Sequence, residues 1–237
     1  MTESRSQTAA RSSSRTANRR MGRAFFDRPT VEVARSLLGT VLSIQGPNGR
    51  RAVRLVETEA YVSNDPASHA FHGPTPRNRS MFSRPGTLYV YRIHQVVCAN
   101  LVTRRGEAVL LRAGEPLTPG LENPSGPGRL CRALGIRLAD DGTDVASDRR
   151  IALGSGGVAS SGVVVGPRIG IRRARRRLLR FALADNEWVS RPRPPAGGRT
   201  TSASPTRTRG DAAKRRSRTT SRRSSGGGRS GGHSVGR

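Results

Sequence analysis

The stretch at residues 52–60 constrains the fold of this chain more than any other, because it has the pattern of a strand. Val53, Leu55, Glu57 and Glu59 recur at every second position, and a period of two places such residues on one face of a strand. Two apolar residues on that face lead directly to two carboxylates. The pattern therefore predicts a carboxylate that is carried from the core to the end of a strand and is partly buried there.

The window from residue 57 to residue 94 concentrates side chains that are rare elsewhere in the chain. Only 4% of the residues are aromatic, yet this window holds all three tyrosines and three of the four histidines: Tyr61, Tyr89, Tyr91, His69, His72 and His94. Residues 62–86 are punctuated by Pro and Gly, and long irregular segments inside a domain are usually functional. A carboxylate with aromatic platforms suits recognition of an unstacked nucleobase, with water as the nucleophile.

Two other kinds of site fit this window less well. His69, His72 and His94 are close in sequence, but their spacing is not that of a zinc site, so we expect no metal and no cofactor. A Ser-His-acid triad lacks its signature turn. His72 reads as a solvated loop residue, Tyr89 as a packing residue, and Glu57 as structural.

The charge of the chain points to a polyanionic partner. The formal net charge is +27, and residues 25–191 keep +11 of it without the two Arg-rich ends. Such a field favours nucleic acid first and an anionic membrane surface second, although no apolar run is long enough to span a membrane. Lys214 is the only lysine, so the body offers no ε-amine for a Schiff base. Cys98 and Cys131 read as buried, inert thiols of a reducing compartment.

Several ordered motifs resemble one known family. They are VETEAY at 56–61, DPASH at 65–69, TPRN at 75–78, GTLYVY at 86–91, CAN at 98–100, LLRA at 110–113, GPGRLC at 126–131 and GPRIG at 166–170. Over residues 25–190 the chain resembles the alkyladenine (3-methyladenine) DNA glycosylases of the mammalian type. The resemblance implies a monofunctional enzyme of base excision repair, without lyase activity. It would flip an alkylated or deaminated purine (3-methyladenine, 7-methylguanine, hypoxanthine or ethenoadenine) out of duplex DNA and hydrolyse its N-glycosidic bond.

The resemblance also implies roles for single residues. Glu59 matches the general base that activates water, and Asn100 matches a residue of the pocket floor that excludes guanine. The walls that stack on the flipped base match Tyr61, His69 and Tyr91. Residues expected at the DNA are Thr75, Arg77, His94 and Arg112, of which His94 would be the wedge that enters the duplex. The family's usual residues are missing around His94, where residues 92–97 are one residue shorter than the family pattern.

Patterns and resemblance together predict an α+β fold. A single mixed domain at 24–191 would have a curved, mainly antiparallel sheet flanked by helices, between disordered basic tails at 1–23 and 192–237. We expect a helix from an N-cap at Thr30 to Gly39, and another at 129–134 that Pro127 starts and Gly135 ends. The strands are expected at 41–44, 52–60, 87–93, 96–102 and 108–112, with a core strand in 162–171 and the last strand in 181–189.

Two alternatives of another class stay open. One is a non-catalytic, basic nucleic-acid-binding protein with a degenerate base pocket; the other is an RNA-binding module like the C-terminal domain of formyltransferases. The Arg172–Arg177 run is read mainly as a solvated face, with phosphate contact as the lesser alternative. As an enzyme the protein would act as a monomer on damaged double-stranded DNA, without a membrane, at the nucleoid of a bacterium or in a eukaryotic nucleus.

Overall fold

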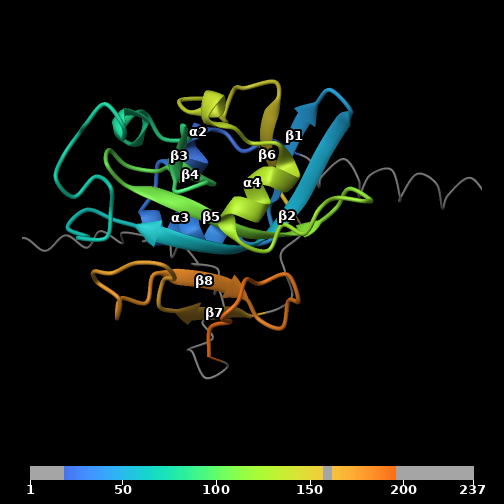
Figure 1. Cartoon of the computed structure of the whole chain (residues 1–237). Coiled ribbons are helices and arrows are strands. Elements are labelled where there is room, and N and C mark those ends of the chain that lie inside the picture. Colours follow the sequence, from blue (N-terminus) through green and yellow to red (C-terminus); the bar gives the residue numbers. More distant parts are fainter. Residues whose placement is uncertain (1–18, 157–161, 196–237) are drawn as a thin grey trace, which may run out of the picture. The chain divides into compact units, whose positions relative to one another are not determined.

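The computed structural model describes residues 19–156 and 162–195 (Figure 1). Its helices are α2 (Arg23–Phe26), α3 (Thr30–Ser36) and α4 (Pro127–Leu134), with short 3-10 turns η1 (Arg79–Phe82) and η2 (Leu138–Asp140). Its strands are β1 (Val41–Gly46), β2 (Gly49–Tyr61), β3 (Leu88–Ile93), β4 (Val96–Val102), β5 (Ala108–Pro116), β6 (Ile151–Gly154), β7 (Val163–Gly166) and β8 (Arg180–Leu183). Most of the two predicted basic tails, at 1–18 and 196–237, lies outside the described residues.

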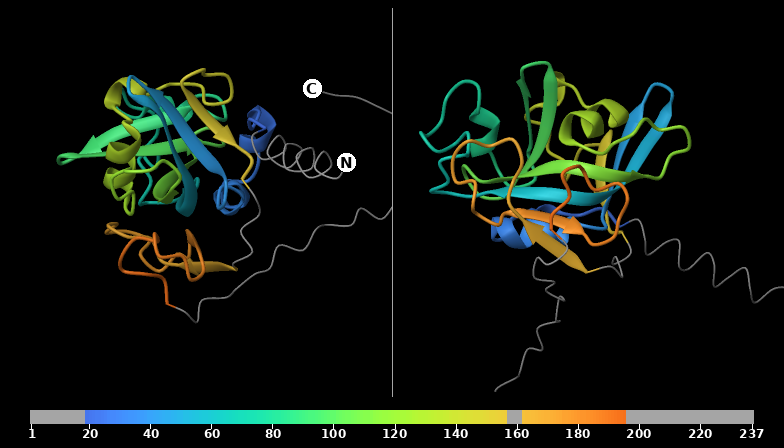
Figure 2. Two further views of the ribbon diagram at one scale, coloured as in Figure 1. Left: turned by 90° about the vertical axis from the view of Figure 1, so that its right-hand side faces the viewer. Right: turned by 60° about the horizontal axis from the view of Figure 1, so that its bottom comes forward.

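The strands form one curled antiparallel sheet, which confirms the predicted α+β class with a mainly antiparallel sheet. The order is β3-β4-β5-β2-β1-β6, and β8 pairs with both β2 and β7. Residues 57–59 of β2 therefore have β5 on one edge and β8 on the other. Figure 2 shows β7 and β8 as a layer beside the rest of the sheet. Glu57 and Glu59 thus lie on a segment of the sheet that is paired on both edges.

A β-bulge in β2 decides which way these two carboxylates point. The pairing of β2 with β5 shifts register on either side of Glu57. Before the bulge Leu55 packs in the main core; after it Ala60 does so, and the Thr58 hydroxyl donates to the carbonyl of Ala34 on α3. The prediction that Val53, Leu55, Glu57 and Glu59 share one face is therefore wrong. The register shifts before Glu57 and shifts back at Arg112 of β5. This irregularity reverses the alternation of β2, and it turns both glutamates away from the main core.

The loop at 62–86 is irregular apart from η1, as the sequence predicts, and one buried side chain holds it together. The Asn78 amide donates to the carbonyls of His69 and Gly73, and its Oδ1 accepts the backbone N–H of Thr75. Asn78 is only 3% exposed. Because three separate points of the loop are tied to one amide, the segment that carries His69 has a defined position.

Other elements differ from the sequence prediction in detail. The N-cap of α3 is Pro29 rather than Thr30, because the Thr30 hydroxyl is buried and bonds Thr103 and Glu107 instead of capping the helix. Strand β6 had no signal in the sequence. The strand within 162–171 exists as β7, but most of it is half-buried rather than core. Helix α4 starts at Pro127 and ends at a left-handed Gly135, as predicted.

The ends of the described part extend beyond the predicted domain boundaries. Arg20 pairs with Gly154 in an isolated bridge and donates to the carbonyl of Ile151. At the other end the carbonyl of Pro192 accepts a bond from Arg180. None of the helices in the described ranges is long and apolar enough to cross a membrane.

The β2–β5 pair is packed so closely beside the bulge that Gly114 has no room for a side chain. Gly114 lies on β5, opposite Leu55 of β2. A Cβ at Gly114 would lie 2.7 Å from Val53 side-chain carbons. We expect Gly114→Ala to lower the free energy of unfolding by about 1–3 kcal/mol through overpacking, as measured by chemical denaturation. Gly46→Ala is the matched control, since its nearest contact would be an ordinary 3.5 Å. Equal stability of the two variants would contradict this account of the bulge.

Candidate active site

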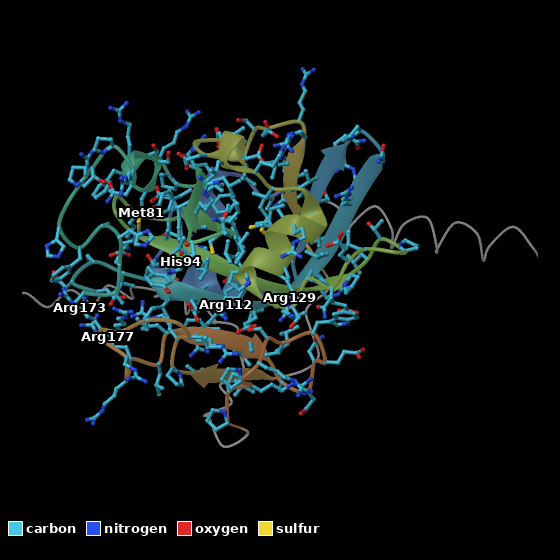
Figure 3. The ribbon with its side chains drawn as sticks, in the orientation of Figure 1. Met81, His94, Arg112, Arg129, Arg173 and Arg177 are labelled. Carbon is cyan, nitrogen blue, oxygen red and sulfur yellow. The ribbon has the colours of Figure 1, made fainter. Side chains whose placement is uncertain are left out.

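A pocket of about 470 Å³ opens where β3, β4 and β5 meet the end of β2. The side chains that line it include Tyr61, His69, Met81, Tyr89, Tyr91, Cys98, Asn100, Arg112 and Ile169, with Ile93, His94, Val96, Arg172 and Arg173 among the rest. Figure 3 labels Met81, His94, Arg112 and Arg173 of this set. Its size is within the usual range for a small-molecule or base site. The structure brings together Tyr61, His69, Tyr91, Asn100, His94 and Arg112 of the predicted site residues.

The aromatic walls of the pocket support one another. The ring centroids of His69 and Tyr91 are 4.5 Å apart at 71°, and those of Tyr89 and Tyr91 are 5.4 Å apart. His69 Nδ1 lies 2.9 Å from the hydroxyl of Tyr89, which fixes the orientation of the imidazole. Burial lowers the pKa of His69, which favours its neutral form. Tyr89 was expected only to pack, and the structure shows that it orients His69.

The carboxylate of Glu59 lies directly behind the pocket. Its Oε1 accepts the backbone N–H of Ile169 at 2.9 Å and lies 3.1 Å from Arg112 Nη1; its Oε2 accepts the Tyr61 hydroxyl at 3.0 Å. All three partners line the pocket. Glu59 is itself 0% exposed, and burial raises its pKa while Arg112 opposes the rise. A carboxylate of this kind is better able to accept a proton than one at the surface.

Arg112 does not present its guanidinium to the surface. Its Nε donates to Glu57 at 3.0 Å, and its Nη2 donates to the Ser190 hydroxyl at 3.3 Å. The residue is 5% exposed. The expected contact between Arg112 and the DNA backbone is therefore not supported by this geometry, because the three nitrogens are taken by groups inside the protein. Glu57 also accepts Arg180 Nε at 2.6 Å.

Tyr61 is held from behind by a second ion pair. The guanidinium of Arg168 lies 4.5 Å from the centroid of the Tyr61 ring, and both of its terminal nitrogens bond the carboxylate of Asp65. The Arg168 and Asp65 side chains are both fully buried. This arrangement fixes the plane of the Tyr61 ring.

The remaining predicted site residues differ in burial and in their distance from the pocket. Asn100 is buried in the pocket wall, and its amide donates to the carbonyl of Tyr89. His94 is exposed at the tip of the β3–β4 hairpin with a φ of 51°. Thr75 and Arg77 are exposed on the 62–86 loop and do not line the pocket.

The described residues contain no group of three or more His, Cys, Asp or Glu side chains that could hold a metal ion. The ring of His72 contacts Phe71, and both residues are exposed. Cys98 and Cys131 are buried and unpaired. Burial raises the pKa of both thiols, that of Cys131 to about 12, which agrees with the prediction that they are inert.

Fold and site define a basic protein with an aromatic pocket that has a buried carboxylate behind it. The model of the methylpurine-DNA glycosylase (MPG) family matches residues 24–187. A protein of Anaeromyxobacter dehalogenans named “Putative 3-methyladenine DNA glycosylase” is 47% identical over 186 residues, which cover 75% of this chain and 88% of the relative. Proteins of the same name from Methanocella arvoryzae and Rhizobium etli are 47% and 41% identical, over 63% and 72% of this chain and 83% and 88% of theirs.

The chain belongs to the methylpurine-DNA glycosylase family, as its motifs indicate. It is thus a DNA repair protein of the class that hydrolyses N-glycosyl bonds of DNA.

Sequence reasoning missed several residues that organise the site. Arg168, Asp65 and Arg180 are all buried and each forms an ion pair, but the sequence gives no sign of which acid an arginine will meet across more than a hundred residues. Asp65, Arg168 and Ile169 entered only as members of the family motifs. Ile169 and Ser190 each contribute a backbone N–H, which no side-chain pattern reveals.

Proposed function

We propose that this protein is a monofunctional DNA glycosylase that excises alkylated or deaminated purines, among them 3-methyladenine, 7-methylguanine, hypoxanthine and ethenoadenine. The observation that carries the proposal is the position of Glu59 behind an aromatic pocket. Its two hydrogen-bond donors, Tyr61 and Ile169, and its ion-pair partner Arg112 all line the pocket. The name shared by the relatives supports the substrate class.

In the proposed reaction Glu59 acts as a general base. Its carboxylate removes a proton from a water molecule whose oxygen attacks C1′ of the deoxyribose. The bond between C1′ and the purine nitrogen breaks, and its electron pair leaves with the base. General-base assistance of this kind is typically worth about 10²–10⁴-fold in rate.

Recognition of the base is assigned to the aromatic walls. Tyr61 on one side and His69 with Tyr91 on the other would stack on a purine, and an alkylated purine is cationic, which strengthens its attraction to electron-rich rings. Neutral His69 could hydrogen-bond the base edge. Asn100 in the floor would help to exclude the amino group of guanine.

Flipping is assigned to the tip of the β3–β4 hairpin. His94 stands there between Ile93 and Val96, which are 49% and 43% exposed although apolar. All three line the mouth of the pocket. Proteins that unstack bases often insert apolar side chains between them, so this short tip would fill the space that the flipped nucleotide leaves. Flipping costs a few kcal/mol and least for a damaged or poorly paired base.

The proposed product is an abasic site with an intact strand, because a lyase step through a Schiff base needs an amine near C1′. Lys214 is the only lysine of the chain, and it lies outside the described residues. Monomeric action on duplex DNA completes the proposal.

Glu59→Gln tests the catalytic assignment. We expect the single-turnover rate constant for release of hypoxanthine from a duplex to fall about 10²–10⁴-fold, while binding to the same duplex persists. Glu115→Gln is the control, since Glu115 forms a half-exposed surface pair with Arg54. Wild-type protein that binds the duplex but releases no damaged purine would instead support the non-catalytic binding protein.

A basic segment beside the pocket suggests where the DNA backbone lies. It consists of Arg172, Arg173, Arg175, Arg176 and Arg177, all exposed. None of the ion pairs within the described residues includes one of these arginines, and Arg172 and Arg173 reach the pocket. Figure 3 shows Arg173 and Arg177 close to each other on this segment. Unpaired guanidinium groups at the mouth of a base pocket suit phosphate contacts better than the predicted Arg112.

Replacing Arg173 and Arg177 by Gln together should reduce the salt dependence of DNA binding. Each lost phosphate contact lowers the slope of log K against log salt by about 0.9, so we expect a decrease of up to about 1.8 in titrations by fluorescence anisotropy. The rate constant at saturating enzyme should stay within a few-fold. Arg50→Gln with Arg149→Gln is the control at the other edge of the sheet; an equal loss of slope there would show only an effect of net charge.

A further inference from the structure

Four buried side chains form a row of alternating charges that runs inward from the pocket: Glu59, Arg112, Glu57 and Arg180. Arg112 lies between the two carboxylates, 3.1 Å from Glu59 and 3.0 Å from Glu57. Arg180 meets the far side of Glu57 at 2.6 Å. Every side chain of this charge row is at most 6% exposed, so solvent screens the interactions little.

We propose that Glu57 and Arg180 set the basicity of Glu59 by controlling how Arg112 divides its positive charge between the two carboxylates. Both are positioning residues, since neither reaches the pocket. The inference rests on the proposed role of Glu59 as general base.

Glu57 lies further from the pocket than Glu59, because among its partners Arg112, Arg180 and Ser190 only Arg112 lines the pocket. Its Oε1 accepts both Arg112 Nε and Arg180 Nε, and its Oε2 accepts the backbone N–H of Ser190 at 2.8 Å. Arg180 in turn donates to the carbonyls of Ser190 and Pro192. The inner half of the charge row is thus held by the segment that follows β8, whereas all three partners of the outer carboxylate, Glu59, line the pocket.

The other ionisable groups around Glu59 leave the charge row as its main control. Tyr61 and Cys98 are neutral near pH 7, because burial raises the pKa of both. Tyr91 lies beyond Cys98 and is likewise neutral, since burial raises its pKa. Arg168, behind Tyr61, is bound at two nitrogens by Asp65. Arg112 therefore is the cation next to Glu59, and its other carboxylate partner is Glu57.

We expect loss of the Glu57 charge and loss of the Arg180 charge to change the pKa of Glu59 in opposite directions. Without the charge of Glu57, Arg112 pairs with Glu59 alone, and the repulsion between the two carboxylates disappears. Both changes lower the pKa of Glu59. Without the charge of Arg180, Glu57 attracts Arg112 more strongly, and Glu59 loses the attraction of the residue opposite it on β8, so the pKa of Glu59 rises. A charged neighbour at such distances typically shifts a pKa by about one unit or more.

The test is the pH profile of single-turnover hypoxanthine release for wild type, Glu57→Gln and Arg180→Gln. The base must be ionised to act, so the rate falls as the pH falls through the pKa of Glu59. We expect this acidic limb to move by about half a unit to one unit to lower pH in Glu57→Gln and to higher pH in Arg180→Gln. The plateau rate of Glu57→Gln should also drop several-fold, because a weaker base assists less.

Loss of structure alone would not shift two profiles in opposite directions. With enzyme in excess, the rate constant reports the folded molecules only, and each variant is decisive by itself if the other does not fold. Arg180→Lys keeps the charge and should restore the wild-type limb. The inference is overturned if the acidic limb of either variant stays at its wild-type position, or if the limbs of both variants move in the same direction. Absence of release by wild type at every pH would instead overturn the proposed function.

Discussion

The interaction on which the site depends is the buried pairing of Glu57 and Glu59 with Arg112 and Arg180. Burying four charges is costly, and it is tolerated only where the groups pair closely and their remaining donors and acceptors are satisfied. Here backbone N–H groups of Ile169 and Ser190 and the carbonyls of Ser190 and Pro192 complete the pairing. These bonds join β2, β5, β8 and the segment after β8. The same bonds that hold the sheet layers together therefore hold the candidate base.

This pairing requires the bulge at Glu57. A regular β2 would send Glu57 and Glu59 to the side of Val53 and Leu55, into the main apolar core, where unpaired carboxylates could not remain ionised. With this irregularity in place, Thr58 turns to α3 and the glutamates turn to Arg112. Fold stability and chemistry thus meet in one irregular stretch of the β2–β5 pair.

Much of this was predictable from the sequence. Alternation and turn residues located most strands and α4, and the rare tyrosines and histidines marked the pocket, since local patterns report local structure. The bulge, β6 and the partners of Arg168 and Arg180 were not predictable, because they depend on pairing between distant segments. The partner of Arg112 was mispredicted for the same reason. The family resemblance suggested that Arg112 binds a DNA phosphate, whereas the structure shows that it pairs with the carboxylates of Glu57 and Glu59. Tyr89 shows that a packing residue and a site residue can be the same side chain.

The central claim is that a damaged purine leaves the duplex and enters the pocket in front of Glu59. It is tested most directly with Glu59→Gln, which should bind without cutting, and a duplex that carries 2-aminopurine next to one hypoxanthine. Flipping unstacks the 2-aminopurine, so we predict that its fluorescence rises on binding and stays unchanged with the undamaged duplex. Tight binding to the hypoxanthine duplex with no change in fluorescence would contradict the account, because the base would then remain in the stack.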